Sequence, residues 1–502
     1  MKRKIPATMA SQHPDHANIP YWHNEAFISV QHENEETYLA YSDLGIDEYK
    51  WDWEGKLVDE SVMERLLSNY YEYFKENQLG KDKFLTFRLP NPKAETEFRL
   101  ARAFINLLSS AALAKKVGLY SPPLFEVILP MTESAEEMIA IQRAFKEISG
   151  LKNELLHFDA NIEQLEVIPL FEQVDTIIHS DEILEKYLQM YKKEFKKKPE
   201  YMRPYTARSD PALNSGMVPT VIAIKIALSR YKKLSEKLDM PLYPIIGTAM
   251  LPFRGGLRPD NVPDFVKEYQ GMKTALIQSG FRYDFDKKVV KKGISELNKL
   301  LPKGEAKIIP DNEEKILREM IPAFEEGYRQ VIEEVAPLIN QLSGILPKRR
   351  ERVQHIGLFG YSRGMGKVTL PRAIGFTAAL YSVGIPPELI GTGRGLRSAS
   401  GPDKKVLEKY YLNFKKDILT AGHYLNKENI KKLSKQYSSF ALVKDDIAVL
   451  EEYFGSKLEP QTLEEKEHHI LTSKIVDSLE NESKEKLTDL IVRAAKLRRS
   501  LG

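Results

Sequence analysis

The sequence predicts an α/β fold, namely a (β/α)8 barrel with additional helices that lie mainly in the C-terminal part of the chain. Short apolar runs alternate with long amphipathic stretches, which is typical of parallel strands joined by crossover helices. Polar and ionisable residues follow these runs, as at the carboxyl-terminal ends of barrel strands. After Thr369 no further strand-like run appears, and helical patterns dominate. Together these three observations predict a barrel with a helical extension.

The strand candidates are short runs rich in apolar, β-branched and aromatic residues. The run at residues 8–12 is the candidate for the first strand of the barrel. Helical patterns lie between most of the later runs, so the strands are expected to pair in parallel. The six clearest runs are residues 84–90, 124–131, 165–171, 201–207, 242–250 and 353–360.

Two helices between these runs have clear sequence signals. Residues 95–117 place Phe98 and other apolar residues on one helical face, and Gly118 follows as a helix-ending glycine should. Residues 134–148 begin with Ser134 and carry glutamate three positions later, which is the pattern of a capping box. Both stretches are therefore predicted to be crossover helices.

The chain is interpreted as one elaborated domain. The barrel is assigned roughly to residues 1–400 and the helical extension roughly to residues 401–502. Residues 405–421 and 463–497 carry long helical patterns within that extension. Pro and Gly gather in residues 385–402, which we interpret as a long functional loop rather than a domain linker, because structureless loops of that length are usually functional or disordered.

The composition excludes several classes of protein. Hydrophobic residues make up 42% and charged residues 29% of the 502 residues, as in an ordinary soluble globular chain. The 74 Lys and Arg nearly balance the 71 Asp and Glu, so no nucleic-acid partner is expected. The absence of cysteine excludes disulfides, cysteine-bound zinc, iron–sulfur clusters and thiol catalysis.

Neither a secretory signal nor a membrane-spanning segment is expected. The N-terminal segment opens with basic residues but then becomes polar, where a signal needs about seven or more apolar residues. The longest apolar stretch, residues 218–228, is interrupted by Lys225. We therefore expect a cytoplasmic protein that has no membrane partner.

Two carboxylates stand at the ends of consecutive predicted strands. Glu172 follows residues 165–171, and Asp210 follows residues 201–207. On a barrel rim these side chains would lie side by side, and two carboxylates suit a hard divalent cation such as Mg²⁺ or Mn²⁺. The alternative is that each carboxylate caps a helix or pairs with an arginine.

Arginines form a second group of candidate residues. Guanidinium groups bind carboxylate and phosphate with two hydrogen bonds, so this group indicates a small phosphorylated, polyanionic substrate. The alternative is that the Gly-Arg stretches at residues 253–258 and 391–397 are structural turns. The arginines follow predicted strands or lie in glycine-rich segments: Arg88, Arg208, Arg254, Arg258, Arg363, Arg372, Arg394 and Arg397.

A single histidine, His13, stands near the end of the candidate first strand. Pro14 restricts the backbone beside it. The alternative is an exposed histidine with no function. The remaining nine histidines have no metal-binding spacing.

At these residues the sequence resembles the phosphoenolpyruvate carboxylase family, in its short archaeal-type form. Residues 8–15 (TMASQHPD) resemble the opening of that form, and residues 44–56 (LGIDEYKWDWEGK) resemble a segment characteristic of it. Glu172 and Asp210 stand where the family has two metal-binding carboxylates. Residues 362–363 and 372–374 resemble substrate-site segments of the family.

The resemblance implies carboxylation of phosphoenolpyruvate by bicarbonate, which gives oxaloacetate and phosphate. It implies that His13 assists the breakdown of carboxyphosphate to CO₂, while Mg²⁺ or Mn²⁺ on Glu172 and Asp210 stabilises the enolate oxygen. It implies a homotetramer and no organic cofactor. The arginines would carry the phosphate, with Arg254, Arg363 and Arg372 in catalytic roles and Arg88, Arg258, Arg208 and Arg394 in substrate-binding roles.

Two alternative functions remain open from the residues alone. One is a metal-dependent barrel lyase or aldolase that acts on 2-oxo acids with the same carboxylates and arginines. The other is a non-catalytic helical binding protein built on a decayed barrel. An assay for oxaloacetate with and without bicarbonate distinguishes all three.

Overall fold

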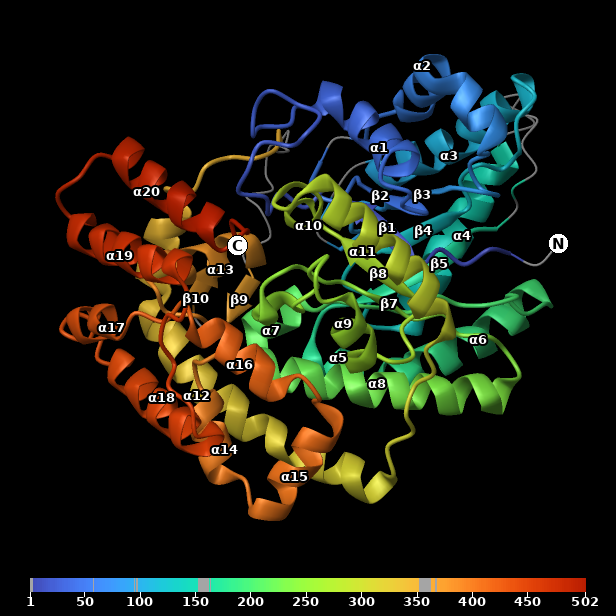
Figure 1. The fold of residues 1–502 in the computed structure, drawn as a ribbon. Coiled ribbons are helices and arrows are strands. Elements are labelled where there is room, and N and C mark those ends of the chain that lie inside the picture. The colour runs from blue at the N-terminus through green and yellow to red at the C-terminus, as the bar shows by residue number, and fades with distance from the viewer. Residues whose placement is uncertain are drawn as a thin grey trace.

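The computed structural model describes residues 3–502, apart from residues 57, 94, 96–97, 152–161, 163, 352–362 and 366–367. Eight parallel strands pair in chain order, and β1 also pairs with β8, so the sheet closes into a barrel (Figure 1). The predicted (β/α)8 barrel is thereby confirmed. The strands are β1 Thr8–Ser11, β2 Glu48–Asp52, β3 Phe84–Arg88, β4 Glu126–Leu129, β5 Glu166–Phe171, β6 Tyr205–Thr206, β7 Ile245–Ile246 and β8 Thr274–Ile277.

The predicted runs contain β1 and β3 to β7, but β6 and β7 are only two residues long. Pro204 and Pro244 directly precede these two strands and have no N–H to donate to a neighbouring strand, which limits the ladder. The run at residues 353–360 lies outside the described residues.

Strand β2 was not predicted, because charged and aromatic residues alternate in its sequence and form no apolar run. Glu48 points into the barrel and pairs with Arg203 at 2.6 Å, whereas Tyr49 and Trp51 pack in the main hydrophobic core. The strand β8, with the sequence TALI, was also missed because it is short and lacks strong flanking signals.

Helices surround the barrel, and they join its strands as crossover connections (Figure 1). The predicted helix at residues 134–148 corresponds to α4, and the one at 95–117 corresponds to α3, which Gly118 follows with a φ of +76°. The helices up to β8 and just after it are α1 Glu33–Ser42, α2 Val62–Glu76, α3 Arg99–Lys116, α4 Ala135–Leu151, α5 Val174–Ile178, α6 Ser180–Phe195, α7 Ser209–Ser215, α8 Met217–Leu238, α9 Val262–Glu268, α10 Ser279–Tyr283 and α11 Lys287–Leu300.

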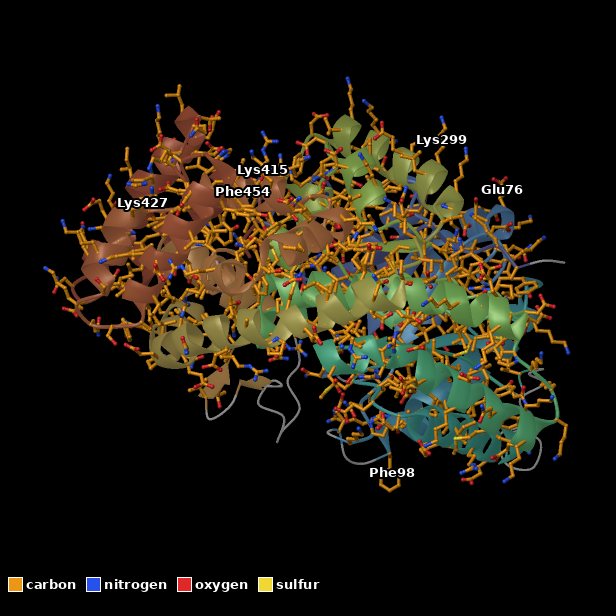
Figure 2. The ribbon with its side chains drawn as sticks, turned by 90° about the horizontal axis from the view of Figure 1, so that it is seen from below. Glu76, Phe98, Lys299, Lys415, Lys427 and Phe454 are labelled. Atoms are coloured by element: carbon orange, nitrogen blue, oxygen red, sulfur yellow. The ribbon has the colours of Figure 1, made fainter. Side chains whose placement is uncertain are left out.

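The periodicity predicted that Phe98 belongs to the buried face of α3, but the structure places it outside that face. It directly precedes the helix, its exposed fraction is 86%, and it projects away from the ribbon (Figure 2). The apolar face therefore begins with the residues of the helix itself.

The second half of the chain is mainly helical and lies beside the barrel (Figure 1). One hydrophobic core cluster contains residues from both halves, and the long helix α12 packs against the barrel helix α8. The elements of this second half are α12 Asp311–Ser343, the antiparallel strands β9 Arg363–Met365 and β10 Val368–Leu370, α13 Ala373–Ser382, α14 Thr392–Ser398, α15 Gly401–Tyr410, α16 Phe414–Gly422, α17 Lys427–Leu433, α18 Phe440–Phe454, α19 Leu463–Ser478 and α20 Lys484–Leu497.

The prediction of a long loop at residues 385–402 is wrong. The segment contains α14 and the first residues of α15, and residues 391–393 are buried against α12 and α18. Gly393 allows this packing, because a Cβ at its position would overlap the backbone of Asp446. The glycines therefore serve close helix packing at this place.

Each of the two long helical patterns near the C-terminus forms two helices. Residues 405–421 span the end of α15 and most of α16, and residues 463–497 span α19 and α20. Among the described helices, none combines the length and the apolar character that crossing a membrane requires.

Candidate active site

A cavity of about 210 Å³ lies at the carboxyl-terminal ends of the barrel strands. Strands β1, β2, β3, β5, β6, β7 and β8, or the residues directly after them, contribute to its wall, and the start of α13 completes it. The polar lining residues are His13, Lys50, Arg88, Arg208, Ser209, Asp210, Arg254, Gln278 and Arg372. The cavity thus combines an imidazole, several cations and a carboxylate.

His13 follows β1 and lines the cavity. Ser11 Oγ lies 2.8 Å from its Nδ1 atom and orients the ring. Burial lowers the pKa of His13 well below 6.5, and the nearby cations Lys50, Arg88 and Arg254 lower it further. His13 is therefore a neutral imidazole that can accept a proton.

Arg88 ends strand β3 and is held by two carboxylates. Its Nε atom donates to Asp52 Oδ1 at 2.7 Å, and its Nη1 atom lies 2.5 Å from Glu54 Oε2. Both partners come from β2 and the residues after it. The guanidinium is thus fixed at the cavity wall before any substrate binds.

Arg254 lies in a short loop after β7, is buried and lines the cavity. It donates to Ser209 Oγ at 3.1 Å and to Gln278 Oε1 at 2.7 Å. Its Nη1 atom also donates to the backbone oxygen of Gly502 and lies 3.7 Å from Asp15 Oδ2. These contacts tie the Arg254 loop to the C-terminal residue.

Arg208 stabilises the same loop through hydrogen bonds to its backbone. Its guanidinium donates to the carbonyl oxygens of Phe253 at 2.9 Å and Pro252 at 3.1 Å. Glu388 completes the support, because its Oε1 atom accepts a hydrogen bond from the Phe253 N–H at 2.8 Å. The side chain predicted to bind substrate therefore also shapes the loop that carries Arg254.

The remaining predicted arginines have different positions. Arg372 directly precedes α13 and lines the cavity. Arg363 begins β9, and its side chain lies outside the described residues. Arg258 pairs with Asp260 at 2.8 Å, outside the cavity lining.

Arg394 also lies away from the cavity. It belongs to α14 and pairs with the fully buried Asp446 at 3.0 Å. Its guanidinium additionally donates to the carbonyl oxygen of Gly327, so it joins α14 to α12 and α18. The neighbouring Arg397 pairs with Asp445 at 2.6 Å. Because Arg394 and Arg397 pair with carboxylates of α18, residues 391–397 pack among helices and do not line the cavity.

Glu172 and Asp210 follow β5 and β6, which pair in parallel with Leu170 opposite Tyr205. Glu172 is 3% exposed, whereas Asp210 is half-buried and lines the cavity. Burial is the larger cause that raises the pKa of the Tyr205 hydroxyl, and both carboxylates raise it further. The two strand ends are thus adjacent, as the sequence predicted.

This donor set fits a hard divalent cation in its chemistry. Both side chains offer carboxylate oxygens, and Asp210 faces the cavity that would supply further oxygen ligands. Within the described part of the chain, no cluster of three or more His, Asp or Glu side chains could hold a metal ion by itself. Water and substrate oxygens would therefore have to fill the other coordination positions.

Sequence reasoning missed Lys50 and Gln278, because it missed the strands β2 and β8. Lys50 lies within β2 and Gln278 directly follows β8. The alternation of charged and aromatic residues in residues 48–54 (EYKWDWE) has the period of a strand, and this signal could have found Lys50.

The chain matches the sequence model of a family described as "Phosphoenolpyruvate carboxylase" over residues 5–502. A phosphoenolpyruvate carboxylase of Leuconostoc mesenteroides is 39% identical over 100% of this chain and 99% of that protein. One of Metallosphaera sedula is 39% identical over 100% of both chains. One of Picrophilus torridus is 36% identical over 99% of both chains.

Proposed function

This chain belongs to the phosphoenolpyruvate carboxylase family, in its short archaeal-type form, and from that premise we propose that the cavity around His13 forms oxaloacetate and phosphate from phosphoenolpyruvate and bicarbonate. The main support is that one cavity brings His13 together with Arg88, Arg254 and Arg372. Three guanidinium groups suit a trianionic substrate, and a neutral imidazole suits proton transfer.

In the first step, a bicarbonate oxygen attacks the phosphorus atom, and the bond between phosphorus and the enol oxygen breaks. The products are carboxyphosphate and the enolate of pyruvate. Arg254 and Arg372, with the side chain of Arg363 as the third candidate, would hold the phosphoryl oxygens as their charge changes. Arg88 would support them, because its two carboxylate partners already fix its position.

In the second step, His13 would take the proton of the carboxyl group of carboxyphosphate. The bond between this carboxyl group and phosphate then breaks, which yields CO₂ and phosphate, and the imidazolium returns its proton to phosphate. The enolate carbon attacks CO₂ and forms oxaloacetate, so the carboxylase is a carbon–carbon lyase in class. The cavity wall around His13 would hold CO₂ beside the enolate.

Glu172 and Asp210 are the residues that would hold Mg²⁺ or Mn²⁺. When bound, such an ion supplies Lewis-acid stabilisation of the negative charge that develops on the substrate oxygen. The buried position of Glu172 and the cavity-facing position of Asp210 support this assignment.

A coupled assay tests the proposal. Purified protein, phosphoenolpyruvate, Mg²⁺ and malate dehydrogenase with NADH should oxidise NADH only when bicarbonate is present. Oxidation of NADH through lactate dehydrogenase, when a 2-oxo acid replaces phosphoenolpyruvate and is cleaved to pyruvate, would point to a lyase or aldolase that acts on 2-oxo acids. No oxidation under any condition would point to a non-catalytic binding protein.

The homotetramer that the family resemblance implies and the cytoplasmic location expected from the N-terminal segment remain predictions. Light scattering during size-exclusion chromatography measures the first. Fractionation of source cells measures the second.

A further inference from the structure

We propose that Lys50 is a further substrate-binding residue, whose ammonium group holds a carboxylate oxygen of the bound substrate beside His13. This inference rests on the proposed function of the cavity. The carboxylate belongs either to phosphoenolpyruvate or to bicarbonate, and the experiment below distinguishes these two sources.

The position of Lys50 in the sheet supports the proposal. Lys50 lies opposite Ser11 in the pairing of β2 with β1, and Ser11 Oγ contacts the His13 ring. Side chains at residues 48, 50 and 52 share one face of β2, and Glu48 on this face pairs with Arg203 inside the barrel. Lys50 therefore points into the barrel, and it lines the cavity.

The contacts of Lys50 do not account for its ammonium group as a structural ion pair. Within the described residues, the carboxylate at ion-pair distance is Asp52, whose Oδ1 atom is 3.4 Å from Lys50 Nζ. The same oxygen already accepts a shorter hydrogen bond from Arg88, at 2.7 Å. An ammonium group has three N–H donors, so Lys50 retains donors for a ligand in the cavity.

The electrostatic surroundings of Lys50 also favour an anionic ligand. Burial, and next the Arg88 cation, lower the pKa of Lys50 to about 8, although Asp52 and Glu54 oppose this shift. His13 faces the same part of the cavity as a neutral group. A bound carboxylate would offset the burial of the ammonium group and would hold it in the protonated form.

The test compares Lys50→Met with the wild-type enzyme. Methionine has a similar length and no charge, and Asp52 keeps its hydrogen bond to Arg88 in this variant. Loss of a charge-assisted hydrogen bond should raise the KM of one substrate roughly 10- to 100-fold. If the KM for bicarbonate rises, Lys50 holds bicarbonate. If the KM for phosphoenolpyruvate rises, Lys50 holds the carboxylate of phosphoenolpyruvate.

Lys50→Arg should restore part of the affinity, because it keeps the positive charge. It should also move the alkaline limb of the kcat/KM profile to higher pH, because arginine does not titrate there. A role limited to structure would not move this limb. The matched control is Lys225→Met, which removes a buried ammonium group that pairs with Glu268 and is not part of the cavity lining.

Two measurements separate failure of this inference from failure of the proposed function. Calorimetric titration with phosphoenolpyruvate and with bicarbonate measures binding without turnover, and circular dichroism checks folding. If Lys50→Met does not fold, Lys50→Gln replaces it. A folded variant that binds both substrates within twofold of the wild type would overturn the role of Lys50, whereas a wild-type protein that makes no oxaloacetate would overturn the proposed function.

Discussion

At the scale of single residues, the state of His13 follows from its neighbours. Burial, and next the surrounding cations, make the imidazole costly to protonate and lower its pKa well below 6.5. In the tautomer in which Nδ1–H donates to Ser11 Oγ, the Nε2 atom of His13 carries no proton and is available to accept one. Its proposed task is to remove one proton from carboxyphosphate and to return it to phosphate.

The first prediction is that His13→Asn separates the two steps of the reaction. Asparagine keeps a hydrogen-bonding group but cannot exchange a proton near neutral pH. Bicarbonate-dependent phosphate release should continue, while oxaloacetate formation falls roughly 10²- to 10⁴-fold and pyruvate accumulates. Assays of phosphate, pyruvate and oxaloacetate on the same sample measure this. An unchanged yield of oxaloacetate would mean that His13 has no part in the reaction.

The second prediction concerns the two strand-end carboxylates. Glu172→Gln or Asp210→Asn should each lower kcat/KM by at least roughly a hundredfold, since even loss of a residue that only supports a metal ligand costs about 10- to 100-fold. Mn²⁺ binding measured by electron paramagnetic resonance should weaken in parallel. The control is Asp445→Asn, an exposed carboxylate that pairs with Arg397 away from the cavity. Wild-type Mn²⁺ affinity in both variants would contradict the metal assignment.

At the scale of elements, the Arg254 loop depends on groups that are far away in the sequence. Arg208 donates to two of its carbonyl oxygens, and Glu388 accepts from the Phe253 N–H. Glu388 Oε1 also accepts from the Tyr381 hydroxyl at 2.7 Å. The second half of the chain thus helps to position a loop of the barrel.

The third prediction is that Glu388→Ala lowers activity while Glu388→Gln preserves it. The Ala variant leaves two buried donors without an acceptor, which costs about 1–3 kcal/mol for each unsatisfied group. Displacement of the loop should then raise KM for phosphoenolpyruvate. The Gln variant keeps an acceptor oxygen and resembles protonated Glu388. Equal KM values in the two variants would contradict a positioning role for this side chain.

The wild type and Glu388→Gln should also differ in how the free energy of unfolding depends on pH. Burial raises the pKa of Glu388 from 4.5 to about 7. The folded state therefore binds more protons than the unfolded state between these values, so the contribution of Glu388 to the free energy of unfolding decreases as pH rises from about 4.5 to about 7. Denaturant unfolding at several pH values should show this decrease in the wild type, with a flatter curve for Glu388→Gln.

At the scale of the whole molecule, the C-terminal residue connects the two halves of the chain. Gly502 is buried, and a Cβ at its position would overlap the carbonyl oxygen of Ile374. Arg254 donates to Gly502, and the Leu501 N–H donates to the carbonyl oxygen of Asp15 at 2.8 Å. Residues 501–502 thus contact Asp15 after β1, Arg254 after β7 and Ile374 in α13.

From these contacts we propose that the chain behaves as one domain, and the fourth prediction is a single unfolding transition. Differential scanning calorimetry should give one peak whose calorimetric and van't Hoff enthalpies agree. Calorimetry of Lys225→Met under the same conditions shows whether loss of one buried ion pair shifts this peak without splitting it. Two separate peaks in the wild type would mean that the barrel and the helical extension unfold independently.

The sequence by itself determined the barrel, and it predicted that the chemistry takes place at the carboxyl-terminal ends of the strands. Strand and crossover periodicity is local, so the runs that contain β3 to β7 could be recognised without knowledge of their neighbours. Parallel strands place their carboxyl ends together, so Glu172 and Asp210 could be predicted to be adjacent. His13 and Arg372 resemble family motifs, and both line the cavity.

Only the tertiary structure decided which charged groups meet. Arg258 and Arg394 were predicted to bind the substrate beside Arg254, but these two pair with Asp260 and Asp446 outside the cavity lining. Lys50 was missed because a charged inner strand face does not look like a barrel strand in sequence. The partner of a charged side chain often lies far away along the chain, and local periodicity carries no information about such distant pairs.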